Sequence, residues 1–207
     1  MLRLYGYASS TNVERVALAL AHKNVPADVI VIDPDDRSAV RAISGQDLVP
    51  VIEDDGTVVF DSTAILRYLE DRYPQAPLFP AEPARRAEME TFLDWFNGVW
   101  KRPPNALVEE LERPQPDAAR VAHLAGEIAS ACDRFEALLD GRDYLLGGEF
   151  SAADCAAYPF LKYAVHKDPA DSHLFHRLLM EHQTTDGRPR WAAWIARMDQ
   201  RPKTPIE

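Results

Sequence analysis

Two apolar runs in the first third of the chain, residues 2–7 and 28–32, have the length and composition of β-strands. Between them, apolar side chains recur at the spacing of an amphipathic helix: Val13, Val16, Ala17, Leu20 and Ala21. The second run is Asp-Val-Ile-Val-Ile, and its β-branched residues predict a strand that is buried on both faces. The chain therefore opens with the order strand, helix, strand.

A hairpin and a further helix follow these elements. Residues 49–52 and 57–60 are β-type runs, and they flank Asp54-Asp55-Gly56, a strong turn signal. A new helical pattern begins at Ile65, and Pro74 ends it because the residue before a proline is driven out of helical geometry. The pattern predicts an α/β domain over residues 1–73, with helices packed on a small mixed sheet.

The pattern of the sequence changes after residue 73. Prolines stand at every third position through the stretch 74–83, a spacing that excludes helix and central strand and predicts a semi-rigid linker. Beyond it β-type runs disappear. Helical patterns cover residues 84–100, 117–139, 151–166 and 189–201. Residues 84–207 are therefore predicted to form an all-α domain, a helical bundle.

Composition and charge restrict the classes of function. The 207 residues hold 33 acidic and 23 basic side chains, and a net charge of −10 argues against nucleic-acid or anionic-membrane binding. The two cysteines, Cys132 and Cys155, fit neither a disulfide framework nor a zinc cluster. No secretory signal is expected, and no apolar run approaches the ~20 residues of a membrane-spanning helix. These features predict a cytoplasmic protein.

Polar side chains stand where the first strand gives way to the first helix. This segment is Ser9-Ser10-Thr11-Asn12. Hydroxyl and amide groups at that position cap helices, and capping is the simpler interpretation. The same free N–H groups, together with the positive end of the helix dipole, also favour a bound anion.

Two further segments can also be interpreted either as purely structural or as ligand-binding. Pro50 removes a hydrogen-bond donor at the start of a strand, which is tolerated there or at a sheet edge. A trans Val49–Pro50 bond is the commoner case, whereas a cis bond would turn the Val49 N–H and C=O toward an extended peptide. Asp61 and Ser62 precede a helix, so they cap it or hold a carboxylate.

Together these motifs resemble the cytosolic glutathione S-transferases, in particular the serine-type members of bacteria. The resemblance rests on Ser-x-x-x-x-Arg-Val after the first strand, then Val-Pro, then Asp-Ser opening a helix. Residues 146–154 also match the capping box that opens the family's central helix, and residues 194–202 match its closing segment. The resemblance covers nearly the whole chain. It implies a thioredoxin-like first domain, an all-helical second domain and a homodimer.

The resemblance also assigns roles, position by position. Ser10, or Ser9 if the loop differs by one residue, would donate a hydrogen bond to the glutathione sulfur. Val49, before Pro50, would pair through its backbone with the cysteinyl unit, while Asp61 and Ser62 would hold the γ-glutamyl end.

The sequence departs from the family pattern at two positions. Thr11 replaces a frequent proline, and Leu48 replaces a glutamine that several members have. Arg37 and Arg41 are the candidates for the glycyl carboxylate.

The function implied is a glutathione transferase with detoxification-type chemistry. A thiol has a pKa of about 8.5, and a hydroxyl donor beside a helix N-terminus favours the thiolate. The thiolate would attack a small electrophile held in an apolar pocket between the domains, for which Trp95 and Trp100 are candidates. Glutathione is then a co-substrate, and no cofactor or metal is expected. The alternatives are a glutathione-dependent isomerase, peroxidase or ether-cleaving enzyme, or a non-catalytic binding or regulatory protein on the same fold.

Overall fold

A computed structural model of the protein describes residues 1–206. The chain divides into two units. The N-terminal unit comprises Met1–Arg86 together with the final segment from Arg201, and the helical unit comprises Ala87–Gln200. The first unit has a mixed sheet with helices and the second is helical, which confirms the predicted fold class.

The sheet of the N-terminal unit has four strands in the order β2-β1-β3-β4. β1 (Leu2–Gly6) pairs in parallel with β2 (Ala27–Val31) and antiparallel with β3 (Val51–Asp54). β3 and β4 (Thr57–Phe60) form the predicted hairpin. Asp55 and Gly56 both have positive φ in its turn, as such a short connection requires.

The prediction that the second strand is buried on both faces is wrong. β2 pairs only with β1 and therefore lies at an edge of the sheet, and none of its residues is fully buried. Val31 is 52% exposed. A β-branched run indicates a strand, but it does not distinguish an edge position from a central one.

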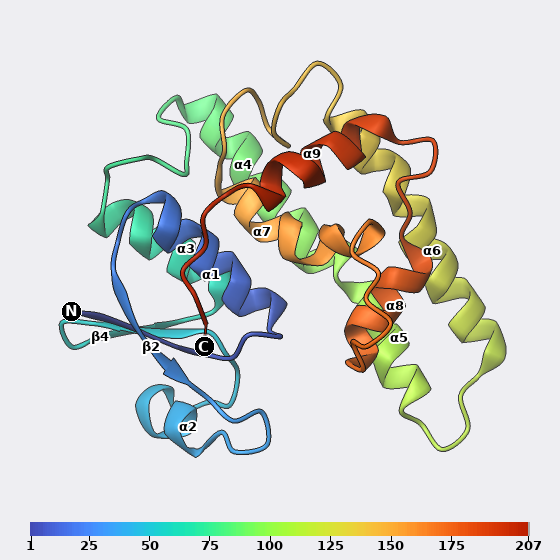
Figure 1. The fold of residues 1–207 in the computed structure, drawn as a ribbon, viewed down its shortest axis with the longest axis horizontal. Helices are drawn as coiled ribbons and strands as arrows, with labels where there is room; N and C mark the ends of the chain where they lie inside the picture. Colours follow the sequence, from blue (N-terminus) through green and yellow to red (C-terminus); the bar gives the residue numbers. More distant parts are fainter. Residues whose placement is uncertain (207) are drawn as a thin grey trace. The chain divides into compact units, whose positions relative to one another are not determined.

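Helices cover both faces of this sheet. Helices α1 (Thr11–His22) and α3 (Ser62–Arg72) lie on one face, and the short α2 (Ser38–Ser44) lies on the other (Figure 1). α1 approaches β1 so closely that a Cβ at Gly6 would lie 2.7 Å from the Val13 methyl groups. A larger residue at position 6 would displace the first turn of α1.

Lys23 anchors the proline-rich segment to the N-terminal unit. Its buried ammonium donates to the carbonyl oxygens of Tyr73, Gln75 and Ala76, and it forms an ion pair of 2.7 Å with Glu70. The same Glu70 carboxylate accepts the backbone N–H of Leu78. A single charged pair thus fixes the path of the segment over several residues.

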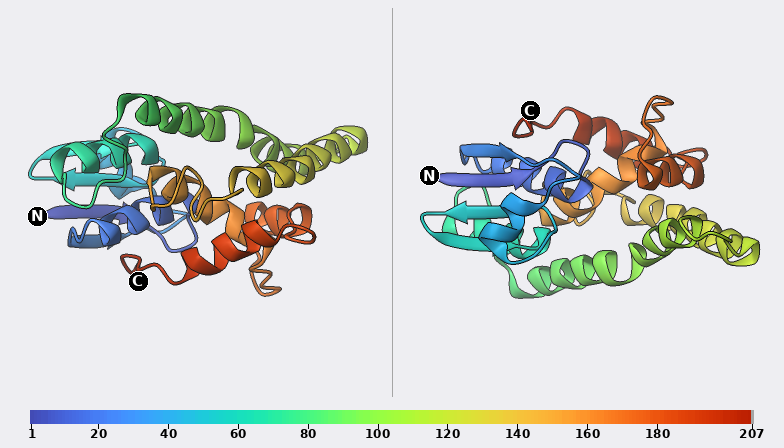
Figure 2. Two further views of the ribbon diagram at one scale, coloured as in Figure 1. Left: turned by 90° about the horizontal axis from the view of Figure 1, so that it is seen from above. Right: turned by 90° about the horizontal axis from the view of Figure 1, so that it is seen from below.

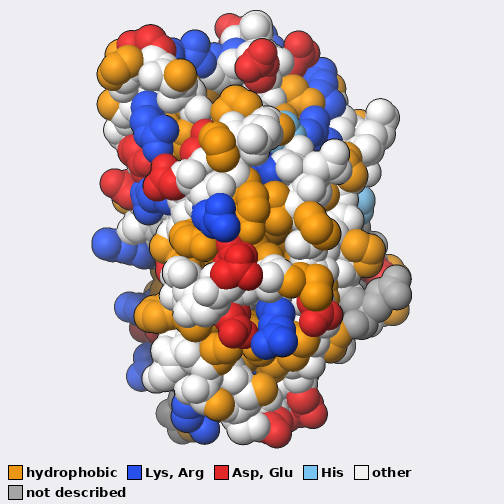
Figure 3. Space-filling model, turned by 90° about the vertical axis from the view of Figure 1, so that its left-hand side faces the viewer, with side chains coloured by type: hydrophobic (Ala, Val, Ile, Leu, Met, Phe, Trp, Pro, Cys, Tyr) orange, Lys and Arg blue, Asp and Glu red, His pale blue; other side chains and the backbone are white. Residues whose placement is uncertain are grey.

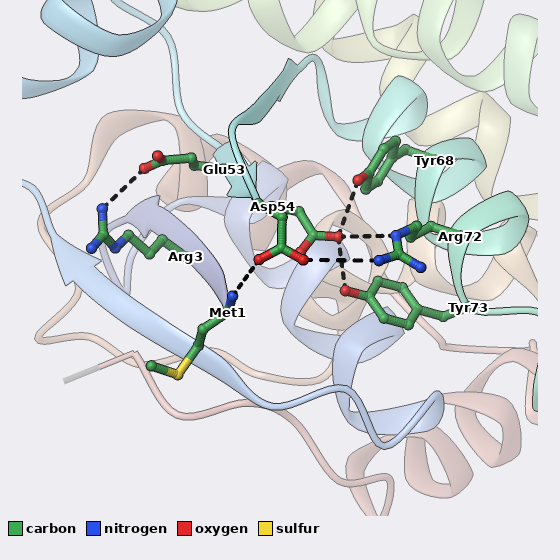
Figure 4. A network of polar contacts seen from close by, with 8 residues as sticks. Met1, Arg3, Glu53, Asp54, Tyr68, Arg72 and Tyr73 are labelled. Atoms are coloured by element: carbon green, nitrogen blue, oxygen red, sulfur yellow. Dashed lines mark hydrogen bonds and ion pairs between the residues drawn. The ribbon is translucent and has the colours of Figure 1, made fainter.

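At the hairpin turn, the buried Asp54 is the centre of a polar network (Figure 4). Its Oδ2 accepts the hydroxyls of Tyr68 at 3.0 Å and Tyr73 at 2.7 Å, and Arg72 lies 3.8 Å away. Burial, and then the hydrogen bond to Asp54, raise the pKa of Tyr73 to about 12. The network holds the end of α3 against the hairpin.

The final segment of the chain returns to α1. The Thr204 N–H donates to the Ala17 carbonyl at 3.1 Å, and Lys203 lies 2.6 Å from the Glu14 carboxylate. Arg201 lies 2.8 Å from His22 Nδ1, at the other end of the helix. These contacts explain why the segment belongs to the N-terminal unit.

The remaining helices extend through the helical unit, and Figure 2 shows them from two sides. They are α4 (Pro83–Trp95), a π-helical turn η1 (Phe96–Trp100), α5 (Arg102–Leu111), α6 (Ala118–Leu138), α7 (Ala152–Leu161), a 3₁₀ turn η2 (Lys162–Ala164), α8 (Leu174–His182) and α9 (Pro189–Asp199). α5 and α6 lie side by side and enclose an apolar cluster with α8.

The buried Asp154 organises the start of α7. Its carboxylate accepts the backbone N–H groups of Leu145 and Ser151, the Ser151 hydroxyl, and the indole N–H of Trp194 at 2.9 Å. This is the capping box that the sequence predicts, extended to a neighbouring helix. The role of Asp154 is structural.

Charged groups of both signs are interspersed on the face of the molecule shown in Figure 3. The excess of acidic side chains therefore does not gather into one acidic area on this face. Within residues 1–206, no helix combines the length and the apolar character that a membrane crossing requires.

Candidate functional site

The strand register brings three of the polar segments to one end of the sheet. Tyr5, near the end of β1, pairs with Val51 at the start of β3, and Val51 pairs with Phe60 at the end of β4. The residues that follow β1, precede β3 and follow β4 therefore leave the sheet at the same end. We call this the open end of the sheet, and Ser10, Val49 and Ser62 lie in the connections there.

Ser10 is the N-cap of α1. Its backbone is extended, and its Oγ accepts the Val13 N–H at 3.3 Å. A hydroxyl has one donor and two acceptor positions, and within residues 1–206 the Ser10 O–H has no acceptor. Ser10 is half-buried whereas Ser9 is exposed and caps nothing. The Ser10 hydroxyl can thus donate to a ligand while it continues to cap the helix.

The Val49–Pro50 peptide bond is cis. Residues 49 and 50 precede β3, so Val49 takes no part in the sheet. In the described part of the chain, neither its N–H nor its C=O has a hydrogen-bond partner. An extended peptide could pair with both groups.

Leu48 is 76% exposed beside this backbone. The nearby Gln46 is occupied, since its side-chain amide donates to the Leu48 carbonyl at 2.9 Å. It therefore does not substitute for the glutamine that Leu48 replaces.

Asp61 and Ser62 open α3 at the same end of the sheet. Asp61 has a φ of 68°, and its Oδ1 accepts the N–H groups of Thr63 and Ala64. Ser62 is buried, and its Oγ accepts a hydrogen bond from Arg15 Nη1 at 3.1 Å. Neither the hydroxyl hydrogen nor the backbone N–H of Ser62 has an acceptor among residues 1–206. Both remain available to an anion.

Arg15 is a residue to which the sequence motifs assign no role. It is only 1% exposed, in the middle of α1, and it joins that helix to the first residue of α3. A charged side chain amid the apolar positions of α1 was the signal available in the sequence.

The two arginines predicted for the glycyl carboxylate differ in their surroundings. Arg37 lies over the Tyr7 ring, 4.8 Å from its centroid, and donates to the Tyr7 hydroxyl at 3.3 Å. Tyr7 belongs to the same β1–α1 connection as Ser10. Arg41 instead forms an exposed ion pair of 2.7 Å with Asp47. The geometry favours Arg37 as the residue associated with the open end.

The two tryptophans have different environments in the helical unit. Trp95 is half-buried and lines a groove of about 620 Å³ with Phe92, Leu138 and Leu146. Trp100 is 5% exposed and stacks on Phe96, with ring centroids 4.5 Å apart. Trp95 is thus partly exposed in a groove, whereas Trp100 is packed in an aromatic cluster.

Within residues 1–206, no three His, Cys, Asp or Glu side chains are grouped as metal ligands. The neighbouring His173 and His176 differ in their burial, and His173 is exposed. His176 is buried, and its Nδ1 lies 2.7 Å from Asp171. The carboxylate partner makes this burial possible. Cys132 and Cys155 are both buried, and within residues 1–206 they are not joined in a disulfide.

Comparisons with known proteins cover both units. The family model described as glutathione S-transferase, N-terminal domain, matches residues 4–77, and that described as glutathione S-transferase, C-terminal domain, matches residues 118–197. The chain is similar to glutathione S-transferase GstB of Escherichia coli (strain K12), with 29% identity over 98% of this chain and 95% of that protein.

The chain is also similar to an isomerase in sequence and to a plant glutathione transferase in structure. Maleylacetoacetate isomerase of Pseudomonas aeruginosa is 38% identical over 93 residues, which are 42% of this chain and 44% of that protein. The crystal structure of poplar glutathione transferase F1 superimposes with a TM-score of 0.76 at 25% identity, covering 97% of this chain and 92% of that chain.

Proposed function

The chain belongs to the glutathione S-transferase family, and we propose that it binds glutathione at the open end of the sheet and transfers it to a small, hydrophobic electrophile. The observation that carries the proposal is the set of unused hydrogen-bonding groups there. The Ser10 O–H, the backbone N–H and C=O of Val49, and the O–H and N–H donors of Ser62 have no hydrogen-bond partners among residues 1–206. Polar groups that are left unused at one place are characteristic of a binding site.

The site offers one partner to each part of the tripeptide. The Val49 N–H and C=O would pair with the cysteinyl unit in the manner of an added β-strand. The Ser62 N–H and O–H would bind the γ-glutamyl carboxylate, and the exposed Asp61 carboxylate would face the γ-glutamyl ammonium. Arg37 would meet the glycyl carboxylate.

Activation of the thiol follows from the position of Ser10. Little thiolate exists at neutral pH when a thiol pKa is about 8.5. A hydroxyl that donates to the sulfur, beside the N-terminus of α1, stabilises the anion and lowers that pKa. The thiolate then attacks the electrophilic carbon, a carbon–sulfur bond forms, and the leaving group departs with the electron pair of the broken bond. Ser10 acts as a donor and is never itself acylated or alkylated.

For the electrophile we propose a surface that includes Trp95. Its partly exposed ring, in a groove that Phe92 and Leu138 also line, supports this assignment. Trp100, which is 5% exposed, would support the pocket from behind.

Calorimetry with glutathione tests the binding step. The account predicts saturable binding at millimolar glutathione or below, and no binding by folded protein would reject it. Incubation with a chloronitrobenzene then tests transfer, because conjugation consumes one thiol for each chloride released.

A glutathione-dependent isomerase is the second candidate. The observation that favours it is the likeness to maleylacetoacetate isomerase over 42% of the chain. An isomerase returns its glutathione, so thiol titration after many turnovers separates the two functions. A constant thiol concentration with maleylacetoacetate as substrate would favour isomerisation.

We also propose that the protein is a homodimer. Val58 and Phe60 support this, since they lie on the edge strand β4 and are 37% and 48% exposed. Sedimentation at micromolar concentration should give twice the chain mass of 23.3 kDa. A monomer at that concentration would contradict the proposal.

A further inference from the structure

The side chain of Gln46 holds the connection between α2 and β3. Its Nε2 donates to the Leu48 carbonyl at 2.9 Å, and its Oε1 accepts the Leu48 N–H. Nε2 also donates to the Ser44 hydroxyl at 2.9 Å, and that hydroxyl donates to the Val40 carbonyl of α2 at 2.8 Å. A single half-buried amide thus ties the backbone of Leu48 to the last residue of a helix.

Neighbouring residues at this place differ completely in how their backbone groups are used. Gln46 satisfies both the N–H and the C=O of Leu48. The N–H and C=O of Val49 have no hydrogen-bond partner among residues 1–206, although Val49 is only 8% exposed. The Leu48 side chain is 76% exposed, so its burial contributes little to holding this backbone. The amide of Gln46 is therefore the main restraint on the residue that precedes Val49.

The bond to the Leu48 carbonyl also sets the direction of the Val49 N–H. The two groups belong to one planar, trans peptide unit, in which the C=O and the N–H point in opposite directions. When Gln46 holds the carbonyl, the N–H is directed to the other side, away from Gln46. Without that bond the peptide plane could rotate about the adjoining single bonds, and the N–H would lose its fixed direction.

The geometry points to Gln46 as a positioning residue that aims the Val49 N–H at the cysteinyl carbonyl of glutathione. The inference rests on the proposed function, since it takes glutathione as the ligand and Val49 as its backbone partner. Gln46 itself does not touch the ligand, because both ends of its amide are used within the protein. It orients the donor before the ligand arrives, so that binding does not have to order this peptide unit.

Two ligands that differ only at that carbonyl test the inference. γ-Glutamylcysteinamide keeps it, whereas γ-glutamylcysteamine has a hydrogen atom in place of the whole carboxamide. Both keep the γ-glutamyl group, the central N–H and the thiol, and calorimetric competition with glutathione measures their affinities. Gln46→Met has a similar length but no amide, and it should bind γ-glutamylcysteinamide about three- to tenfold more weakly than the wild type, the size of one net hydrogen bond. Its affinity for γ-glutamylcysteamine should fall less than about twofold.

Gln46→Glu separates the donor of the amide from its acceptor. At neutral pH the carboxylate still accepts the Leu48 N–H but has no hydrogen to give to the Leu48 carbonyl. The added charge acts on both ligands alike, because they carry the same charged groups. Gln46→Glu should therefore show the same ligand-selective loss as Gln46→Met. Equal losses for the two ligands in either variant would overturn the inference, since a purely structural role would weaken both alike.

Asp47→Asn is the matched control in the same connection. The Asp47 carboxylate forms an exposed ion pair of 2.7 Å with Arg41, so this variant loosens the connection but leaves the amide of Gln46 in place. Neither ligand should lose more than about twofold in affinity. A selective loss as large as that of Gln46→Met would overturn the inference, because any weakening of the connection would then have the same effect.

Circular dichroism checks that each variant folds. If Gln46→Met does not fold, Gln46→Glu makes the same comparison on its own. Absence of glutathione binding by the folded wild type would reject the proposed function. Glutathione binding by the wild type, together with equal losses for the two ligands in the variants, would reject only the role of Gln46.

Discussion

The two ends of the four-stranded sheet use their polar groups differently. At the hairpin turn, Asp54 accepts two tyrosine hydroxyls and lies near Arg72, and no ligand is needed to complete the network (Figure 4). At the open end, the hydroxyls of Ser10 and Ser62 accept hydrogen bonds from the protein, but neither hydroxyl donates to an acceptor among residues 1–206. Polarity alone does not indicate function. Hydrogen-bond donors that have no partner in the protein do indicate function, because a folded protein otherwise pairs its buried polar groups.

The comparison predicts that a substitution at the hairpin end reduces stability and leaves binding unchanged. Asp54→Ala leaves the hydroxyls of Tyr68 and Tyr73 without their acceptor, and it should lower the free energy of unfolding by about 2–4 kcal/mol. Urea denaturation measures this loss, and calorimetry should give an unchanged glutathione affinity.

Asp55→Ala is the control for Asp54→Ala. This neighbouring side chain is 66% exposed and pairs with Met1 and Arg72 at the surface, where ion pairs contribute little, so its removal should cost much less stability than Asp54→Ala does. Similar losses for the two variants would show that the buried network is not what stabilises this end of the sheet.

Tyr73→Phe tests the same network through pH. Because burial and the hydrogen bond to Asp54 raise the pKa of Tyr73 to about 12 in the folded protein, its hydroxyl stabilises the fold fully below its unfolded pKa near 10. That contribution is lost as the pH rises from 10 to 12. Tyr73→Phe should lower the free energy of unfolding by about 1 kcal/mol at neutral pH. The variant should also lack the part of the decrease in stability between pH 10 and 12 that Tyr73 causes. An unchanged decline in the variant would assign it to another group.

Asp61→Asn has the smallest expected effect, at the open end. Asparagine tolerates the φ of 68° and can still cap α3, so the free energy of unfolding should stay within about 0.5 kcal/mol. Loss of the charge facing the γ-glutamyl ammonium should lower glutathione affinity by about two- to fivefold. Unaltered affinity would leave Asp61 with capping as its only role.

Local patterns in the sequence were sufficient for most of the fold. Periodicity and turn residues predicted the strands of the N-terminal unit, and the capping box at Asp154 is where the motif places it. Two helices of the helical unit were missed, and so was the short α2 of the N-terminal unit. α5 begins at Arg102-Pro103-Pro104, where prolines look like a break but are tolerated in a first helical turn. α8 is short, and its polar side chains include His176, whose burial depends on Asp171.

Some residues of the candidate site could be predicted from local sequence patterns, whereas others depend on contacts between distant parts of the chain. The motifs predicted Ser10, Val49 and Ser62, since each lies at the boundary of a strand or helix. Arg15 was not assigned because its contact with Ser62 joins residues 47 positions apart, and no local pattern contains such a pair. Glu110, which no sequence motif singles out, is buried and accepts hydrogen bonds from the Asp117 N–H and from Arg113. Arg15 thus contacts a residue far away in the sequence, whereas these partners of Glu110 lie three and seven positions further along the chain.

Titration of the glutathione thiolate by its ultraviolet absorbance tests the central claim most directly. Ser10→Ala removes one charge-assisted hydrogen bond worth about 1.5–3 kcal/mol, so the pKa of the bound thiol should rise by roughly one to two units. Ser9→Ala, at the exposed neighbour, should leave that pKa unchanged. If Ser9→Ala shifts the pKa and Ser10→Ala does not, the assignment is wrong by one residue. If neither variant shifts it, the unused hydroxyl at the open end does not activate the thiol, and the account is contradicted.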